Sequence, residues 1–197
     1  MGTSTGAGPG PGPFDGCPEA WLEPTDVLYR VHKEWHEPWY FAPRATAMKD
    51  SGRWDLPSPW GTCYLAEVQR GAFVEVVGRQ THQIDLEDVA ERRISALSTP
   101  DRVRLADVFD PGWWGCAGVA AGIGGERGYA VTHPLAERLH RAGFCGVRYR
   151  LRRDPDLAGV ALFGPRYLRS WPVRATEPIS DDLVWGAARR YRMKVLP

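Results

Sequence analysis

The run Val27-Leu28-Tyr29-Arg30-Val31-His32 decides where ordered structure begins in this chain. It is apolar, β-prone and partly alternating, so it predicts a strand that carries Arg30. The preceding residues 1–19 are mostly Gly, Pro, Ser and Thr, which bury too little apolar surface to fold. We therefore predict a flexible tail over residues 1–19 and a single domain over residues 20–197.

The composition is that of an average globular protein. Hydrophobic residues make up 43% and charged residues 25% of the 197-residue chain, and the formal net charge is +1. These values argue against a disordered, fibrous or membrane protein, and they give no overall field that would attract nucleic acid. The sequence holds no run of about 18 apolar residues and no secretion signal. We expect a cytoplasmic protein without a membrane or nucleic-acid partner, and a homo-oligomer is compatible with the sequence.

Cysteines and histidines give no sign of a metal site. Cys17, Cys63, Cys116 and Cys145 are far apart, without the close pairs of a zinc site or the density of a secreted disulfide scaffold. We expect reduced thiols. His32 and His36 are four residues apart, but they lie on a strand that leads into a loop, and no third ligand is evident.

The rest of the sequence predicts a mixture of strands and helices. Residues 72–77 fit either a strand or a helix of two turns, and residues 86–109 suggest two short helical or mixed elements with a break at Ser98-Thr99-Pro100. The remaining expectations are a packed aromatic loop to Pro59, a Gly-rich loop over 112–128, strands over 61–66, 145–151 and 159–163, and helices over 135–141 and 181–191.

A glycine-rich segment and an arginine-rich segment are candidates for nucleotide binding. The loop over 122–128 lacks the G-x-G-x-x-G spacing of a dinucleotide site, so we interpret it as a flexible loop. On the strand over 145–151, alternation places Arg148, Arg150 and Arg152 on one face, either as a solvated edge or as a phosphate contact.

Four landmarks occur in order in the first half of the chain. Taken singly, each arginine, tyrosine or glutamate among them fits an ordinary surface or packing role. The landmarks are Leu28-Tyr29-Arg30, Gly52-Arg53-Trp54, Tyr64-Leu65-Ala66 and Ala72-Phe73-Val74-Glu75. This order resembles the RES (Arg-Glu-Ser) domain, a family of NAD-degrading toxins of bacterial toxin–antitoxin systems that is distantly similar to ADP-ribosyltransferases. The resemblance favours a helix that ends near Glu75.

The C-terminal landmarks extend the resemblance to Phe163. The family's glycine-aromatic-x-glycine-hydrophobic-x-tyrosine strand matches residues 143–149, and its closing valine-alanine-leucine-phenylalanine strand matches residues 160–163. Between Val77 and Tyr129 the two cannot be aligned. The family's tyrosine-x-serine-arginine corresponds to Tyr149-Arg150-Leu151-Arg152, so Leu151 stands where the family has its serine.

The resemblance implies an α/β (α+β) fold with a mixed, split β-sheet core, flanking helices and a cleft that binds NAD, as in ADP-ribosyltransferases. It implies that Glu75 stabilises positive charge on the ribose, that Arg30 and Arg53 bind the pyrophosphate, and that Tyr64 stacks on nicotinamide or fixes the ribose. Tyr149 is expected to face the cleft with Leu151, while Arg150 and Arg152 point away. Arg30, Glu75 and Tyr64 are the expected catalytic residues, and Arg30, Arg53, Tyr64 and Tyr149 the expected NAD-binding residues.

The same resemblance implies cleavage of the nicotinamide–ribose bond, with phosphate or water as the acceptor. NAD is then the substrate, phosphate a co-substrate, and neither a cofactor nor a metal is required. An antitoxin protein that covers the cleft is the expected partner. Two alternatives stay open: an ADP-ribosyl transferase of the same fold, and a degenerate nucleotide-binding module without turnover.

Overall fold

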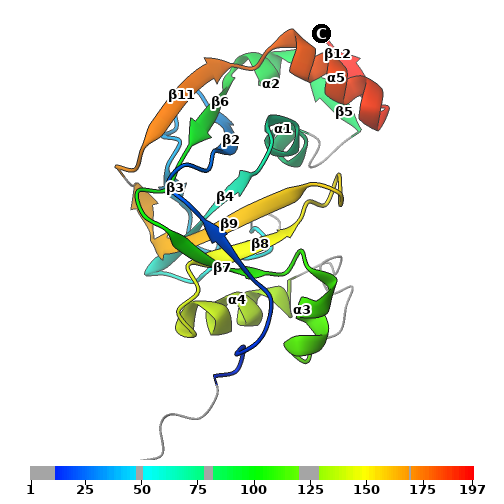
Figure 1. The fold of residues 1–197 in the computed structure, drawn as a ribbon. Helices are drawn as coiled ribbons and strands as arrows, with labels where there is room; N and C mark the ends of the chain where they lie inside the picture. The colour runs from blue at the N-terminus through cyan, green and yellow to red at the C-terminus, as the bar shows by residue number, and fades with distance from the viewer. Residues whose placement is uncertain (1–11, 48–50, 78–81, 120–128, 169) are drawn as a thin grey trace, which may run out of the picture.

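A computed structural model describes residues 12–47, 51–77, 82–119, 129–168 and 170–197. Its centre is an eight-stranded mixed sheet in the order β1-β7-β8-β9-β4-β2-β6-β11 (Figure 1). The strands are β1 (Glu19–Leu22), β2 (Leu28–Lys33), β4 (Trp60–Ala66), β6 (Arg92–Leu97), β7 (Val103–Asp107), β8 (Gly146–Arg150), β9 (Ala158–Pro165) and β11 (Val173–Pro178). The expected mixed α/β fold is confirmed.

The sheet is split near its middle. β4 pairs with β9 along its whole length, and β2 pairs along its whole length with β6. Between β2 and β4, however, the antiparallel ladder contains a single pair of Cα partners, Tyr29 and Ala66. The remaining neighbours in the sheet are antiparallel except for β7 and β8, which run parallel. Because β2 and β4 separate beyond this one pair, side chains from both strands can reach a space between them.

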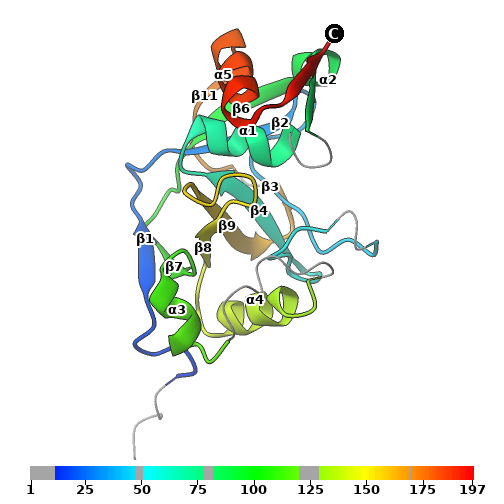
Figure 2. The same cartoon turned by 90° about the vertical axis from the view of Figure 1, so that its right-hand side faces the viewer.

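The described residues form five helices beside the sheet. They are α1 (Gln69–Val77), α2 (Leu86–Ala90), α3 (Pro111–Cys116), α4 (Thr132–Arg141) and α5 (Asp181–Tyr191). Figures 1 and 2 show α1, α2 and α5 at one end of the molecule, beside β2 and β6, and α3 and α4 at the other end. In the described segments, none of these helices is long and apolar enough to cross a membrane.

Local signals account for the ends of the helices. The Ser180 hydroxyl accepts the N–H of Leu183, and acidic residues in the first turn and arginines in the last turn of α5 complement its dipole. Asp110 caps α3, with Pro111 in the first turn. Gly143 follows α4 with a φ of +85°, a conformation that glycine adopts without strain.

Two apolar cores fill the two faces of the sheet. Alternate residues of β4 belong to different cores: Tyr64 and Ala66 pack on the helix side, and Cys63 and Leu65 on the opposite side. The helix-side core contains buried residues of α1, α4 and α5. The opposite core is covered by three aromatic side chains. Phe41 lies on the short strand β3 (Tyr40–Phe41), and Trp39 and Trp171 lie on segments without regular structure.

Two small two-stranded sheets lie outside the main sheet. β3 (Tyr40–Phe41) pairs antiparallel with β10 (Tyr167–Leu168), and β5 (Gln83–Asp85) pairs parallel with β12 (Lys194–Leu196). The second pair attaches the C-terminal segment beside α1 and α5. The aromatic loop that precedes β4 is packed as expected, with Trp39 and Trp54 each 1% exposed.

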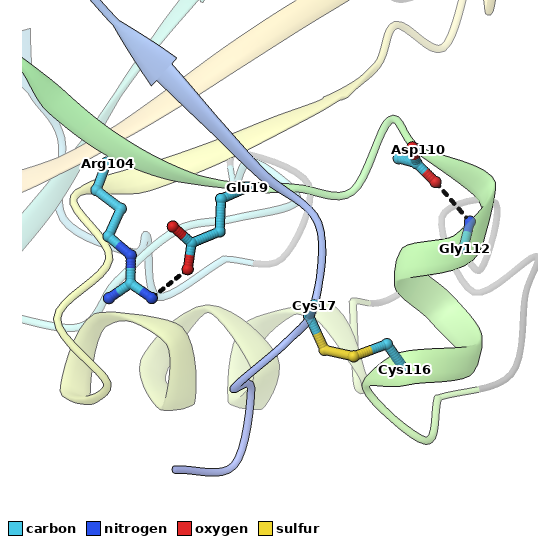
Figure 3. Close-up of a disulfide and its surroundings, with 6 residues drawn as sticks. All are labelled: Cys17, Glu19, Arg104, Asp110, Gly112 and Cys116. Atoms are coloured by element: carbon cyan, nitrogen blue, oxygen red, sulfur yellow. Dashed lines mark hydrogen bonds and ion pairs between the residues drawn. A yellow bond between two sulfur atoms is a disulfide. The ribbon is translucent and has the colours of Figure 1, made fainter. Parts of the chain in front are cut away.

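The segment before β1 is more ordered than the sequence suggests. Residues 1–11 lie outside the described residues, but Phe14 is buried and stacks on Trp113. Cys17 forms a disulfide with Cys116 at the end of α3 (Figure 3). Glu19 pairs with Arg104 on β7. The folded domain therefore begins at about Phe14, earlier than the expected boundary at residue 20.

The disulfide contradicts the expectation of reduced thiols for two of the four cysteines. The Cα atoms of Cys17 and Cys116 are 5.5 Å apart, within the range that a disulfide spans, although 99 residues separate the two positions. Cys63 is buried and Cys145 exposed, and both are free. Pairing of β1 with β7 brings Cys17 and Cys116 together, which spacing in the sequence does not reveal.

In the middle of the chain the prediction of two short helical or mixed elements over 86–109 was wrong in part, because only Leu86–Ala90 form a helix, α2. Residues 92–97 and 103–107 form β6 and β7, and the Ser98-Thr99-Pro100 break joins two strands instead of starting a helix. β6 pairs with β2 and β11, and β7 pairs with β1 and β8, so pairing with distant strands decides the structure of this segment. Within the expected Gly-rich loop, α3 forms, and residues 120–128 lie outside the described residues.

The other elements agree with expectation. The strands expected over 27–32, 61–66, 145–151 and 159–163 correspond to β2, β4, β8 and β9. The segment over 72–77 forms a helix, and the expected helices over 135–141 and 181–191 correspond to α4 and α5.

Candidate active site

A cavity of about 170 Å³ lies where β2 and β4 separate. It is lined by all five residues predicted from the sequence, which come from five segments: β2, the loop before β4, β4 itself, α1 and β8. The full lining comprises Tyr29, Arg30, Val31, Arg53, Tyr64, Leu65, Ala66, Ala72, Glu75, Val76, Tyr129, Tyr149, Leu151 and Arg152.

Helix α1 forms one side of the cavity and presents Glu75. Ala72, Phe73 and Val74 are buried in the helix-side core, which fixes the rotation of the helix. The Oε1 atom of Glu75 accepts the backbone N–H of Arg153 at 3.1 Å, and its Oε2 atom accepts from no described residue. Glu75 is thus oriented by one hydrogen bond while keeping an oxygen free for a ligand.

The loop before β4 carries Arg53 and is held by a buried hydrogen-bond network. Asp55 is 4% exposed; its Oδ2 accepts the N–H of Gly52 at 2.6 Å, and its Oδ1 accepts the Tyr64 hydroxyl at 2.7 Å. The same hydroxyl accepts the N–H of Trp54 at 2.8 Å. Both residues that flank Arg53 are therefore tied to Tyr64 and Asp55.

This network limits what Tyr64 can do chemically. Burial, together with the neighbouring Asp55 carboxylate, raises the pKa of Tyr64 well above its ordinary value. The proton stays on the phenol, and it is already donated to Asp55. Tyr64 therefore offers the cavity its ring, which suits stacking or apolar contact with a ligand, while its hydroxyl shapes the Arg53 loop.

A glycine and a histidine complete the support of this loop. A Cβ on Gly52 would lie 2.3 Å from the Tyr64 hydroxyl oxygen, so glycine is required for the close approach. The Nε2 atom of buried His133, on α4, donates to the Gly52 carbonyl at 2.8 Å. The Arg53 guanidinium then lies above the Tyr149 ring, 5.6 Å from its centroid, and donates to the Arg150 carbonyl at 3.4 Å.

Arg30 lines the cavity from β2, but part of its guanidinium is held from the other face of the sheet. Its Nη1 atom donates to the carbonyls of Pro38 at 2.6 Å and Tyr40 at 3.1 Å, and it contacts Cys63 Sγ at 3.2 Å. Nε and Nη2 donate to no described residue. A ligand that Arg30 binds would therefore use these two nitrogens.

Leu151 occupies the family's serine position as a packed core residue. It is 1% exposed and lies beside two glycines, where a Cβ on Gly71 would come within 2.7 Å of its Cδ1 and one on Gly159 within 2.5 Å of its Cδ2. It lines the cavity together with Tyr149, as alternation predicts. The site at this point is therefore apolar.

The expectation that Arg152 points away from the cavity was wrong. β8 ends at Arg150 and residues 152–153 form a bend, so strand alternation does not extend to Arg152. Arg152 lines the cavity. Arg150 does point elsewhere, since it donates to the carbonyls of Pro155 and Phe109.

The basic face of β8 is largely used inside the protein. Arg148 forms ion pairs with Glu67 at 2.6 Å and Asp107 at 3.2 Å. The hydrogen bond to Glu67, together with the charge of Asp107, raises the pKa of Arg148. Of the three arginines expected on one face, only Arg152 faces the candidate site.

Sequence reasoning missed the positioning residues Asp55 and His133 and gave no role to Tyr29 or Tyr129. It left Arg152 open between a solvated edge and a phosphate contact. Asp55 follows the Gly52-Arg53-Trp54 landmark directly, and an Asp that closes a loop onto a backbone N–H three residues earlier is a recognisable turn signal. His133 gives no such signal, because its partner lies 81 residues away.

The described residues contain no group of three side chains that could hold a metal ion. His32, one of the two histidines four residues apart, is buried and uses both ring nitrogens, one with the Lys33 carbonyl and one with the Ser95 hydroxyl. Burial lowers the pKa of His32, so its ring is neutral at neutral pH.

Comparison with known proteins agrees with this arrangement. The RES domain matches residues 27–182, well over half of the chain. The chain therefore belongs to the RES domain family. A chain in the crystal structure of the M. tuberculosis MbcT–MbcA toxin–antitoxin complex has a similar fold, with a TM-score of 0.63 and 14% identity over 86% of this chain and 92% of that chain. No curated protein matches the sequence.

Proposed function

We propose that this chain degrades NAD by cleaving the bond between nicotinamide and ribose, with phosphate or water as the acceptor. The observation that supports this proposal is the convergence of Glu75, Arg30 and Arg53 on one cavity, although they come from a helix, a strand and a loop. A single carboxylate among cations suits a ligand that develops positive charge at one end and carries phosphate at the other.

The reaction places specific demands on these residues. The C–N bond breaks and its electron pair leaves with the nicotinamide nitrogen, which loses its positive charge. The ribose then carries oxocarbenium-like charge until an oxygen of phosphate or water bonds to C1′ and releases its proton to solvent. The free Oε2 of Glu75 stabilises that charge, and Arg30 and Arg53 hold the diphosphate. Tyr64 and Tyr149 supply aromatic surface to the nicotinamide riboside.

The size of the cavity agrees with one end of NAD. About 170 Å³ is below the range of roughly 300–1,000 Å³ for sites that enclose a whole drug-sized ligand. We propose that the nicotinamide riboside enters the cavity and that the adenosine end lies across its mouth. No cofactor is required for this chemistry.

As a biological role, we propose a toxin whose antitoxin covers the mouth of the cavity. The MbcT–MbcA complex, which shares the fold, is a toxin–antitoxin pair. We propose the cytoplasm as the site of action because the NAD pool is intracellular. Since disulfides are rare in that compartment, the redox state of the Cys17–Cys116 pair in cells is a direct check of the location.

The experiment that tests the function is incubation of the purified chain with NAD, with and without phosphate, followed by identification of products. Free nicotinamide with ADP-ribose indicates hydrolysis, and a phosphorylated ADP-ribose indicates phosphorolysis. ADP-ribose attached to a macromolecule would instead support the transferase alternative. Binding of NAD without any product would support the degenerate binding module, to which the apolar Leu151 lends some weight.

A further inference from the structure

We propose that Arg152 binds a phosphate oxyanion of the ligand and is a third cationic contact of the site. The inference rests on the proposed function, since it concerns the same cavity. The oxyanion belongs either to the diphosphate of the nucleotide or to free phosphate acting as the acceptor. Its chemistry is the same in both cases: a guanidinium fork that donates to phosphate oxygens.

The first support comes from the partners of the neighbouring arginines. Arg148 is held by two carboxylates, and Arg150 by two backbone carbonyls. Arg53 donates to a carbonyl and lies over the Tyr149 ring. Arg152 lines the cavity, yet its guanidinium has no hydrogen-bond or ion-pair partner among the described residues. No described residue therefore occupies the hydrogen-bond donors of its guanidinium, and they can serve a ligand.

The second support is the rigid backbone that carries Arg152. On one side, Leu151 is packed beside Gly71 and Gly159, and its N–H donates to the Leu157 carbonyl at 3.0 Å. On the other side, the N–H of Arg153 donates to Glu75. The position of Arg152 is therefore coupled directly to the carboxylate that we propose as catalytic, which favours a preorganised contact.

A buried carboxylate anchors the far end of the same bend. Asp154 is 5% exposed; its Oδ2 accepts the Tyr191 hydroxyl at 2.6 Å and Arg190 Nε at 3.4 Å, both from α5. Its backbone carbonyl accepts the N–H of Leu157 at 2.9 Å. The bend thus has fixed contacts before and after Arg152, while the described residues offer the Arg152 guanidinium no hydrogen-bond or ion-pair partner.

The charge of the lining is the third support. Among its ionisable side chains, Arg30, Arg53 and Arg152 carry positive charge at neutral pH, and Glu75 is the only carboxylate in the described lining. The sum is +2, which matches the two negative charges of a nucleotide diphosphate. Without Arg152 the sum would be +1, and one phosphate charge would lack a counterpart.

The test compares Arg152→Gln with the control Arg150→Gln. The control removes the same positive charge, two residues earlier, from a side chain that does not line the cavity. Binding of ADP-ribose, adenosine and inorganic phosphate is measured by calorimetry, because binding does not require turnover. We expect Arg152→Gln to weaken ADP-ribose binding by about tenfold to a hundredfold, the range for a lost charge-assisted hydrogen bond, and to leave adenosine binding unchanged. Arg150→Gln should bind ADP-ribose like the wild type. Arg152→Lys keeps the positive charge but not the forked guanidinium, so its affinity for ADP-ribose should lie between those of the wild type and Arg152→Gln.

Two measurements on Arg152→Gln identify the source of the oxyanion: ADP-ribose binding, and the response of NAD cleavage to phosphate. Weakened ADP-ribose binding with unchanged acceleration of NAD cleavage by phosphate assigns Arg152 to the diphosphate. Unchanged ADP-ribose binding with weakened phosphate binding and lost acceleration assigns it to the acceptor. If Arg152→Gln binds both probes like the wild type, or if the wild type binds neither, the inference is overturned. If the wild type does not consume NAD but Arg152→Gln still weakens ADP-ribose binding, the proposed function fails and the inference stands.

Discussion

The two walls of the cavity are built by different physical means. The loop wall, residues 51–56 with Tyr64, is held by the hydrogen bonds among Asp55, Tyr64 and the backbone on either side of Arg53. The helix wall, α1 with residues 149–154, is held mainly by apolar packing of Leu151 beside Gly71 and Gly159 and by one hydrogen bond from Arg153 to Glu75. A polar wall gives directional precision, whereas an apolar wall depends on filled volume.

This difference predicts which kind of substitution should destabilise each wall. Removing one partner from a buried hydrogen-bond network leaves the other partner unsatisfied, which costs about 1–3 kcal/mol. Removing a packed side chain leaves a cavity, which costs about 2–5 kcal/mol for a leucine. The helix wall should therefore be the more sensitive of the two to loss of volume, and the loop wall to loss of a single polar atom.

The largest expected effect is on the stability of the helix wall. Leu151→Ser should lower the free energy of unfolding by about 2–5 kcal/mol, because Leu151 is almost fully buried. Per folded molecule, the restored hydroxyl should accelerate NAD cleavage by roughly threefold to a hundredfold, most visibly with phosphate as the acceptor. Denaturant titration and product formation measure the two quantities.

Leu151→Ala is the matched control, since it leaves a similar cavity without a hydroxyl. Acceleration by Leu151→Ser but not by Leu151→Ala would assign the gain to the hydroxyl. If the wild type and Leu151→Ser are equally inert while NAD is bound, the nucleotide-binding alternative replaces the enzyme.

Removal of the charge on the helix wall should have the next largest effect. Glu75→Gln keeps the shape of the side chain but should lower NAD turnover by about a hundredfold, since a group that acts on transition-state charge is lost. Binding of ADP-ribose should change little. Glu87→Gln on α2, outside the cavity lining, is the control and should turn over NAD normally. Undiminished turnover in Glu75→Gln would remove the carboxylate from the mechanism.

A smaller effect is expected from one atom of the loop wall. Tyr64→Phe removes the hydroxyl that donates to Asp55 and accepts from Trp54, so the free energy of unfolding should fall by about 1–3 kcal/mol. Tyr29→Phe is the matched control, because the Tyr29 hydroxyl has no partner among the described residues. Equal stability of the two variants in thermal or denaturant unfolding would show that the network does not hold the loop.

The smallest expected effect is an acid sensitivity of the helix wall. Burial pushes the pKa of Asp154 upward, but hydrogen bonds from Tyr191 and Arg190 outweigh it and leave the pKa below its ordinary value. Because the folded pKa is depressed, Asp154 stabilises the fold above the unfolded pKa of about 3.9, and this contribution is lost as pH falls through the folded value. The stability of Asp154→Asn should therefore fall less steeply than that of the wild type below about pH 4. Parallel pH profiles would rule out this contribution.

Several features of the site could be predicted from the sequence because they depend on local patterns. The strand with Arg30 and the helix with Glu75 follow from residue type and from the order of the landmarks. Arg152 was placed wrongly because strand alternation was extended beyond Arg150, where the chain bends. The Tyr64–Asp55 bond and the Cys17–Cys116 disulfide depend on how distant segments pack. Local propensity carries no information on such pairs.

The disulfide also makes the chain a partial ring. The closed loop runs from Cys17 to Cys116 and contains β1, β2, β4, α1, β6 and β7, hence Arg30, Arg53, Tyr64 and Glu75, whereas Tyr149 and Arg152 lie on the linear remainder. In the loop-entropy view, a closure of this length lowers the entropy of the unfolded chain by the equivalent of about 4–5 kcal/mol. A protease cut inside the loop would leave one covalent molecule until a reductant separates the pieces, while a cut after Cys116 would give two pieces with no covalent link between them.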